Sequence, residues 1–459
     1  MTSLKRLILA LLALVLPAGP ALAAADTAEH KLGNGMRVIV KPDRRAPVVV
    51  VMLLYQVGSM DEVNGVTGVA HVLEHMMFKG TAATPAGEYS RAIAAAGGRD
   101  NAFTSNDYTG YFVVLQKSRL ELALRLEADR MANLILSPEE FAKEIKVVME
   151  ERRLRTEDRP RALVYEQLMA TALAAHPYRN PIIGWMSDLD NMRVDDAREF
   201  YQRWYAPNNA ALVVVGDVEP DDVVALAEKY FGAIPARTLP ERKPQDEPPQ
   251  LGVKRVTVKA PAELPYVLMT FRTPALRDPE REWEPYALEM LAAVLDGSDA
   301  ARLHRTLVRE ERIASSADAS FDSIARGPGF FYLAAAPTPG RSALEVEQAL
   351  RREMAKIIEH GVDQEELDRV KAQAVAAHVF QRDSMFFQAQ QIASLEAAGI
   401  SHETLDLQLK KLREVTPQQV QEVARKYFRD DVLTIATLDP QPLEGGRRAM
   451  PSLPVRHAQ

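Results

Sequence analysis

The sequence has 459 residues, of which 47% are hydrophobic and 26% are charged, values typical of a soluble globular protein with room for roughly two to four domains. Its formal net charge of −7 argues against nucleic-acid binding, which requires a basic surface. The absence of cysteine excludes disulfide bonds, thiolate metal ligands and a lipidated cysteine.

The N-terminal residues 1–23 have the pattern of a signal peptide. Lys5 and Arg6 precede an apolar run from 7 to 16, and Ala21-Leu22-Ala23 is a typical cleavage site. The apolar run is too short for a membrane-spanning helix, which needs about 20 residues. We therefore expect an exported protein without a permanent membrane anchor, located in the periplasm of a double-membrane bacterium or secreted.

The remaining chain repeats one structural plan. An amphipathic helix that starts near residue 195 and ends at 205 is followed by a turn and a strand over 211–215, and the same order recurs in the helix, turn and strand of 416–438. Strands predicted at 36–40 and 253–258 open the two parts. Such a unit occurs in any α/β protein, but here both copies close their parts, which favours duplication. The fold class predicted is α+β in two similar halves.

A stretch rich in proline and charge separates these halves. The segment 235–249 contains Pro240, Pro244 and Pro248 among charged residues, a composition that cannot bury itself. It predicts a linker over 235–252, an N-terminal domain over 24–234 and a C-terminal domain over 253–459.

The segment His71-Val72-Leu73-Glu74-His75 contains the residues with the clearest chemistry. Residues four apart share one face of a helix, so two imidazoles at this spacing can bind one metal ion. Glu74 lies close to the same face, where it can reach a water molecule on the metal without being a ligand. On this segment alone, a surface helix with two solvated histidines remains the competing interpretation.

A catalytic zinc site needs a third protein ligand and one open position. The other seven histidines stand apart in the sequence, so a carboxylate is favoured. A helix beginning at Ser137-Pro138 carries Glu144, Glu150 and Glu151. Glu144 and Glu151 are seven residues apart and share a face, whereas Glu150 points about 100° away. The spacing leaves both Glu150 and Glu151 open as the third ligand.

With its flanking segments, the motif resembles the insulinase/pitrilysin family of inverted-motif zinc peptidases, and especially its short-chain branch, which includes mitochondrial processing peptidase. The resemblance extends over the mature chain and rests on four segments: Gly65–Ala70, His71–His75, Met77–Thr81 and Val147–Glu151. It implies a clam-like chamber, one zinc ion per chain held by His71, His75 and Glu151, with Glu144 supporting the ligands and Glu74 as the catalytic base.

The resemblance also implies how substrate binds. The segment 97–105 matches the strand edge that takes an unfolded peptide as an added strand in this family, with Asn101 holding the peptide backbone and Ala102 and Phe103 beside it. An ordinary turn amide is the competing interpretation of Asn101. In the second half, Arg309 matches an arginine that binds substrate.

The sequence departs from the family seven residues after Arg309. Active members have a tyrosine there, but this chain has Ser316, and Ile313 replaces a preceding glycine. Two interpretations follow. The chain is the zinc subunit of a heterodimer, whose partner is a paralogue that lacks the zinc motif and supplies the arginine and tyrosine. Alternatively, it is a non-catalytic binding or assembly subunit. The intact metal set favours the first.

Overall fold

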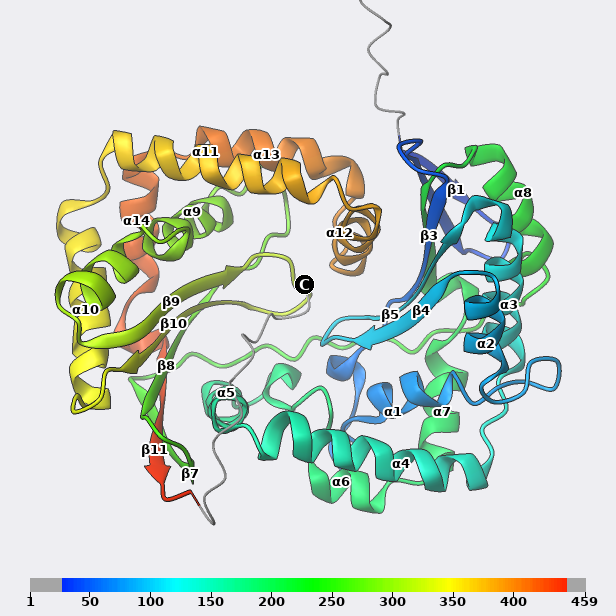
Figure 1. Cartoon of the computed structure of the whole chain (residues 1–459), viewed down its shortest axis with the longest axis horizontal. Coiled ribbons are helices and arrows are strands. Elements are labelled where there is room, and N and C mark those ends of the chain that lie inside the picture. The colour runs from blue at the N-terminus through cyan, green and yellow to red at the C-terminus, as the bar shows by residue number, and fades with distance from the viewer. Residues whose placement is uncertain (1–26, 444–459) are drawn as a thin grey trace, which may run out of the picture.

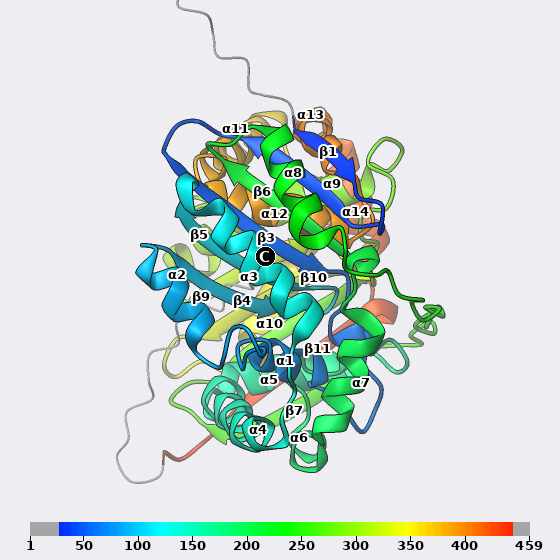
Figure 2. The same cartoon turned by 90° about the vertical axis from the view of Figure 1, so that its right-hand side faces the viewer.

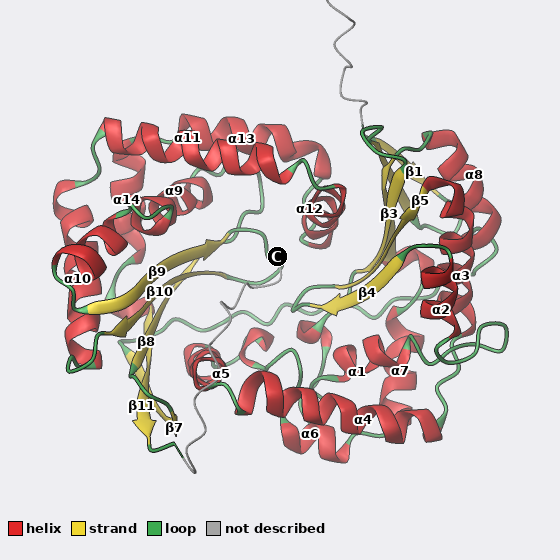
Figure 3. Cartoon of the chain, viewed as in Figure 1, coloured by secondary structure: helices red, strands yellow, loops and turns green. Residues whose placement is uncertain are grey.

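The computed structural model describes residues 27–443, and the expected signal peptide at 1–23 lies outside this range. The chain forms two halves, each a sheet packed against helices, which face each other like the shells of a clam (Figures 1 and 3). Among the described residues, no helix has both the length and the apolar character needed to cross a membrane.

From residue 27 onward, the first half has six strands and eight α-helices. The strands are β1 (Ala28–Lys31), β2 (Arg37–Pro42), β3 (Val48–Tyr55), β4 (Arg99–Thr104), β5 (Thr109–Gln116) and β6 (Ala210–Gly216). The helices are α1 (Val69–Met76), α2 (Glu88–Ala95), α3 (Leu120–Asn133), α4 (Pro138–Arg152), α5 (Pro160–Ala172), α6 (Met186–Asn191), α7 (Val194–Trp204) and α8 (Pro220–Phe231). In Figure 2, which faces this half, α2, α3 and α8 lie across the outer face of the sheet.

The second half, as described to residue 443, has five strands and six α-helices. The strands are β7 (Lys254–Pro261), β8 (Tyr266–Thr273), β9 (Ala314–Asp322), β10 (Gly329–Pro337) and β11 (Leu433–Gln441). The helices are α9 (Glu284–Asp296), α10 (Ala343–His360), α11 (Gln364–Gln381), α12 (Met385–Ala397), α13 (Leu405–Glu414) and α14 (Pro417–Tyr427).

The two sheets share one topology. The first has the order β1-β2-β6-β3-β5-β4 and the second β7-β11-β8-β10-β9, so removing β1 makes the orders equivalent. In each sheet one early strand pairs in parallel with the closing strand, β2 with β6 and β7 with β11, while the other pairs are antiparallel. The two-half α+β architecture expected from the sequence is therefore present. The expectation that a strand at 36–40 opens the first half was wrong, because β1 precedes it.

Each half covers the inner face of the other half's sheet. Strand β3 is buried along almost its whole length because its alternate side chains lie in two different cores. Val51 and Leu53 pack with the helices of the first half. Val50 and Met52 pack instead against Ile392 of α12, which belongs to the second half. In Figure 1 α12 lies beside β3, between the two halves.

The reverse contact is made by α5 of the first half. Val164 and Leu168 on this helix are buried against Leu268, Ala334 and Leu438 of the second sheet. This exchange means that separating the halves would expose apolar surface on both sheets, which is unfavourable by about 25 cal/mol per Å².

The segment 235–252 has neither helix nor strand, and its polar groups bond to both halves. Arg242 pairs with Asp61 and lies over the ring of Trp204, while Glu247 accepts hydrogen bonds from three backbone N–H groups at 174–176. Gln250 donates to the carbonyl oxygen of Leu433 at 2.6 Å. The linker is thus held against both halves by polar contacts, although it has no hydrophobic core of its own.

Candidate active site

A tightly packed loop fixes the start of α1, which carries the candidate metal-binding residues His71 and His75. Gly68 precedes the helix with φ +88°, and a Cβ there would lie 2.5 Å from the carbonyl oxygen of Ile183. Only glycine fits this conformation and this contact. The buried carboxylate of Glu62 accepts hydrogen bonds from the N–H groups of Gly68 and Ala70, both at 2.8 Å, and so caps the helix.

Three side chains from α1 and α4 converge. The Nε2 atom of His75 lies 3.2 Å from Oε2 of Glu151, and Nε2 of His71 lies 3.8 Å from the same oxygen. His71 is only 8% exposed, and the other two are half-buried. Glu150, which the spacing left open as a ligand, points away and pairs with Arg153. The structure therefore brings His71, His75 and Glu151 together.

This set of donors fits a zinc ion. Zinc takes imidazole nitrogen and carboxylate oxygen at about 2.0–2.2 Å in tetrahedral sites, which places neighbouring donors roughly 3.4 Å apart. The three donor atoms here lie within 4.8 Å of one another, and two of the separations, 3.2 and 3.8 Å, bracket that value. Three protein donors leave one coordination position for water or substrate, as catalytic zinc requires.

Glu144 supports His75 from the opposite side of the imidazole. Its Oε1 lies 2.9 Å from Nδ1 of His75, and Oε2 pairs with the ammonium of Lys79. A carboxylate on the outer ring nitrogen fixes the tautomer and orientation of a metal-binding histidine. Glu144 is 8% exposed, so little water competes for this contact.

Glu74 lies next to the donors without joining them. The hydroxyl of Thr104 on β4 donates a 2.6 Å hydrogen bond to its Oε2, so Oε1 is left available to a water molecule. Burial raises the pKa of Glu74, which is 8% exposed, although the bond from Thr104 opposes this shift.

The two histidines differ in their electrostatics. Burial, reinforced by the charge of His75, lowers the pKa of His71 to about 4, so its ring is neutral and can act as a ligand. Burial also acts to lower the pKa of His75, but hydrogen bonds to Glu144 and Glu151 outweigh it and raise that pKa to about 9. The carboxylates of Glu144 and Glu151 therefore favour positive charge beside them, as they would favour a bound cation.

Strand β4 forms the edge of the first sheet, next to α1. Asn101 is exposed and belongs to this strand, not to a turn. Its Oδ1 accepts a hydrogen bond from the N–H of Ala102 at 2.9 Å. Ala102 and Phe103 are half-buried, and the ring of Phe103 meets that of Tyr108 edge-on at 5.6 Å. The strand edge and the metal-binding helix therefore adjoin.

Arg309 and Ser316 take no part in this arrangement. Arg309 lies on a π-helical turn (His304–Glu310), where its ion-pair partner is Asp299, at 3.7 Å, in its own half. The Oγ of Ser316 on β9 is buried and has no hydrogen-bond partner among the described residues. No described ion pair or hydrogen bond joins either side chain to His71, His75 or Glu151.

A second cluster of histidine and carboxylates joins the halves at another place. Glu29, Glu396 and His402 approach one another closely enough to suggest a cation site. The guanidinium of Arg37 pairs with both carboxylates, and Nδ1 of His402 lies 2.7 Å from Oε1 of Glu396. Because an arginine already supplies the positive charge, this cluster is an ion-pair network between the halves.

Three neighbours of the site were not singled out from the sequence. Arg155 lies four residues after Glu151, and this helical spacing is a usable signal. Lys79 follows the end of α1 and pairs with Glu144 of α4, a contact that depends on how the two helices pack. Thr104 had no such signal, because its contact with Glu74 depends on how β4 packs against α1.

The sequence and fold match known peptidases. The model of the insulinase family (peptidase family M16) matches residues 37–185, and that of the M16 inactive domain matches 191–374. The zinc protease PqqE of Helicobacter pylori is 31% identical over 415 residues, which cover 89% of this chain and 92% of the relative. A zinc protease of Mycobacterium leprae, uncharacterized by its name, is 30% identical over 88% of this chain and 89% of the relative.

Solved structures agree with this similarity. A protease from Helicobacter pylori superposes with a TM-score of 0.86 at 30% identity, covering 90% of this chain and all of that one. The periplasmic protease PqqL from Escherichia coli superposes with a TM-score of 0.77 at 23% identity, over 90% of this chain and 48% of that chain, and shows the fold alone. The chain belongs to the insulinase family, peptidase family M16.

Proposed function

We propose that this chain is an exported, zinc-dependent endopeptidase or oligopeptidase that hydrolyses unfolded peptides, as the zinc subunit of a heterodimer. The observation that carries the proposal is the convergence of His71, His75 and Glu151, with Glu74 beside them, within a clam-like fold. The names of its relatives, which are zinc proteases, support the same chemistry.

In this proposal His71, His75 and Glu151 hold zinc, which, when bound, supplies a Lewis acid that lowers the pKa of water and polarises the peptide carbonyl. Glu74 takes a proton from the attacking water and passes it to the leaving amine. Thr104 restrains one oxygen of Glu74, so the other is oriented for this transfer. General base assistance of this kind is worth about 10² to 10⁴ in rate.

The exposed edge of β4 supports unfolded peptides as the class of substrate. Backbone N–H and C=O groups of an edge strand can pair with an extended peptide of almost any sequence. Folded proteins have few free extended segments, so a peptide that adds to β4 beside α1 must be unfolded. We place Asn101, Ala102 and Phe103 in this contact, with side-chain amide and apolar groups next to the added strand.

Export rests on residues 1–23 alone, whose pattern is that of a cleaved signal peptide. In a double-membrane bacterium such a signal peptide would direct the protein to the periplasm. The similar protease PqqL is periplasmic by its name. Fusion of residues 1–30 to a reporter enzyme and fractionation of the cells tests this; reporter in the cytoplasm would contradict it.

The partner is inferred from what the second half lacks. Ser316 carries no ring, and Arg309 pairs with Asp299 within its own half. A homodimer would repeat the same deficiency. A paralogue without the zinc motif but with the arginine and tyrosine would correct it. The chain alone should therefore hydrolyse unstructured peptides slowly, and Ser316→Tyr with Ile313→Gly should recover part of the rate. A chain that alone is as fast as its mixture with the paralogue would rule out the need for a partner.

The central test uses two matched carboxamide variants. Glu74→Gln should retain zinc and lose peptide hydrolysis by about 100-fold or more, because it removes the base and leaves the ligands. Glu151→Gln should lose zinc affinity instead. Metal content and turnover of both are measured on the purified protein with its partner. Wild-type protein without stoichiometric zinc, and without any response to a chelator, would favour the binding or assembly subunit in place of the enzyme.

A further inference from the structure

Arg155 contacts the candidate metal centre but was not part of the expected machinery. It lies on a π-helical turn (Arg153–Glu157) that continues α4 beyond the metal-binding carboxylate. Its Nη1 lies 2.7 Å from Oε1 of Glu151, the oxygen that does not face the histidines. Insertions of π-helix into α-helices are frequent at functional sites.

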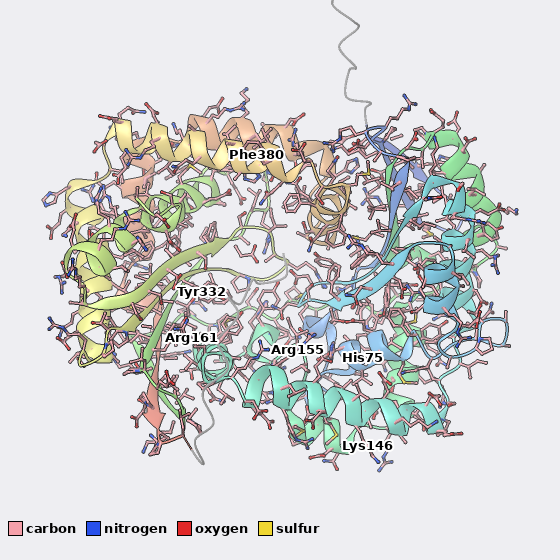
Figure 4. All side chains as sticks on the ribbon, viewed as in Figure 1. His75, Lys146, Arg155, Arg161, Tyr332 and Phe380 are labelled. Atoms are coloured by element: carbon pink, nitrogen blue, oxygen red, sulfur yellow. The ribbon has the colours of Figure 1, made fainter. Side chains whose placement is uncertain are left out.

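The other arginines of this segment are engaged elsewhere. Arg152 is 4% exposed and bonds to the carboxylate of Glu166 and the carbonyl of Gly184. Arg153 pairs with Glu150, which points away from the site. Arg155 alone of the three reaches Glu151, and Figure 4 shows it nearer the centre of the molecule than His75, on the side that faces the second half.

Most of the hydrogen-bonding capacity of Arg155 is unused. Its side chain is 69% exposed, and Glu151 is its ion-pair partner among the described residues. A guanidinium has five N–H donors in a fixed plane, so one contact leaves four. A side chain that only orients Glu151 would gain from burial, whereas the side chain of Arg155 is largely exposed.

We propose that Arg155 is a substrate-binding residue, which pairs with Glu151 through Nη1 and donates other N–H groups to a backbone carbonyl oxygen of the peptide. This inference rests on the proposed peptidase function. Arg155 would then be a cationic donor that the zinc half itself places beside the candidate metal centre. Arg309 of the second half pairs with Asp299 and makes no described contact with this centre. Arginine suits this role because it remains charged and can bond two acceptors at once.

A purely structural role would have a different consequence. If Arg155 only orients Glu151, its removal weakens zinc binding, and saturating zinc restores peptide binding. If it binds substrate, peptide binding stays weak even when zinc saturates the site. The two roles therefore separate in a binding experiment, without reference to turnover.

The experiment uses the Glu74→Gln protein, which should bind peptide without cleaving it. The dissociation constant of a fluorescently labelled, unstructured peptide is measured by anisotropy at saturating zinc, and zinc affinity by competition with a chelator. Arg155→Ala should raise the peptide constant by about tenfold or more, as expected for a lost charge-assisted hydrogen bond. Arg155→Lys should restore part of the loss. Arg153→Ala, on the same turn, is the matched control and should change neither constant.

Equal peptide affinity with and without Arg155 at saturating zinc would overturn the inference, and so would a loss that Arg153→Ala reproduces. Those results leave the peptidase proposal intact as long as the Glu74→Gln protein binds zinc and peptide. Absence of zinc and peptide binding in the Glu74→Gln protein itself would instead overturn the proposed function, and this inference with it.

Discussion

Replacing Glu144 by Gln tests how the proposed zinc ligands are held. The substitution preserves the shape of the side chain and can keep a neutral hydrogen bond to His75, but it removes the charge. In the structure this carboxylate lies 2.9 Å from Nδ1 of His75 and also pairs with Lys79. We expect the variant to fold normally and to bind zinc more weakly.

The size of the effect follows from these two contacts. A hydrogen bond to a charged group is worth about 1.5–3 kcal/mol and a neutral one about 1, so the change at His75 alone costs roughly 1 kcal/mol. Glu144→Gln also leaves the half-buried ammonium of Lys79 without its counter-charge near a cation site, which adds repulsion. Together these effects predict a loss of about 10- to 100-fold in zinc affinity, the range found for such supporting carboxylates.

Competition with a chromophoric chelator measures the affinity directly. Glu150→Gln is the control, because Glu150 is on the same helix, is 58% exposed and pairs with Arg153. At saturating zinc, Glu144→Gln should recover most of the wild-type turnover, since the proposed base and the three proposed ligands remain. Zinc affinity within twofold of wild type would refute the role assigned to Glu144.

Three further predictions concern stability, each measured by denaturant unfolding. Ile392→Ala removes a fully buried side chain of α12 from the first sheet and should destabilise the protein by about 2–5 kcal/mol, while Val379→Ala, at a site that is 51% exposed, should cost far less. Gly68→Ala should destabilise by roughly 2 kcal/mol or more through its left-handed backbone and the clash with Ile183, whereas Gly65→Ala, with φ +96° but open space, should cost less. The pKa of Glu396 is lowered: burial opposes this, but bonds from His402 and Arg37 outweigh it. Its stabilisation is therefore present above the unfolded pKa of about 4.5 and is lost as pH falls through the lower folded value, so Glu396→Gln should flatten the acid limb; an unchanged limb would contradict this.

Local sequence patterns were sufficient to predict much of the architecture. The hydroxyl of Ser137 accepts a hydrogen bond from the N–H of Glu140, and Thr416 forms a capping box with Gln419, so both helix starts lie where the sequence indicates. The repeated helix, turn and strand correspond to α7 with β6 and α14 with β11. The sequence did not reveal β1, a short strand whose residues are mostly exposed and therefore carry no hydrophobic alternation.

Contacts between distant segments could not be predicted in the same way. The continuous apolar run of β3 indicates burial on both faces, but not that α12, more than 300 residues later, covers one of them. Thr104 reaches Glu74 only because β4 packs beside α1. The spacing of Glu144, Glu150 and Glu151 left two candidate ligands, and only the direction of α4 relative to α1 separates them in space.

The connection between the halves strengthens the case for a partner. Besides the exchanged helices, Arg326 in the turn between β9 and β10 bonds to the carboxylates of Asp61 and Asp107 in the first half, at 2.8 and 2.9 Å. The side chain of Asp61 is almost fully buried, and loss of Arg326 would leave Arg242 as its remaining arginine partner, which would be destabilising. The strand that carries Ser316 is thus fixed at its far end to the zinc half. Movement of β9 toward the proposed metal site would break these bonds, and it would still bring a serine where the proposal expects a tyrosine. A second chain that supplies the tyrosine would make this movement of β9 unnecessary and would provide the ring that Ser316 lacks.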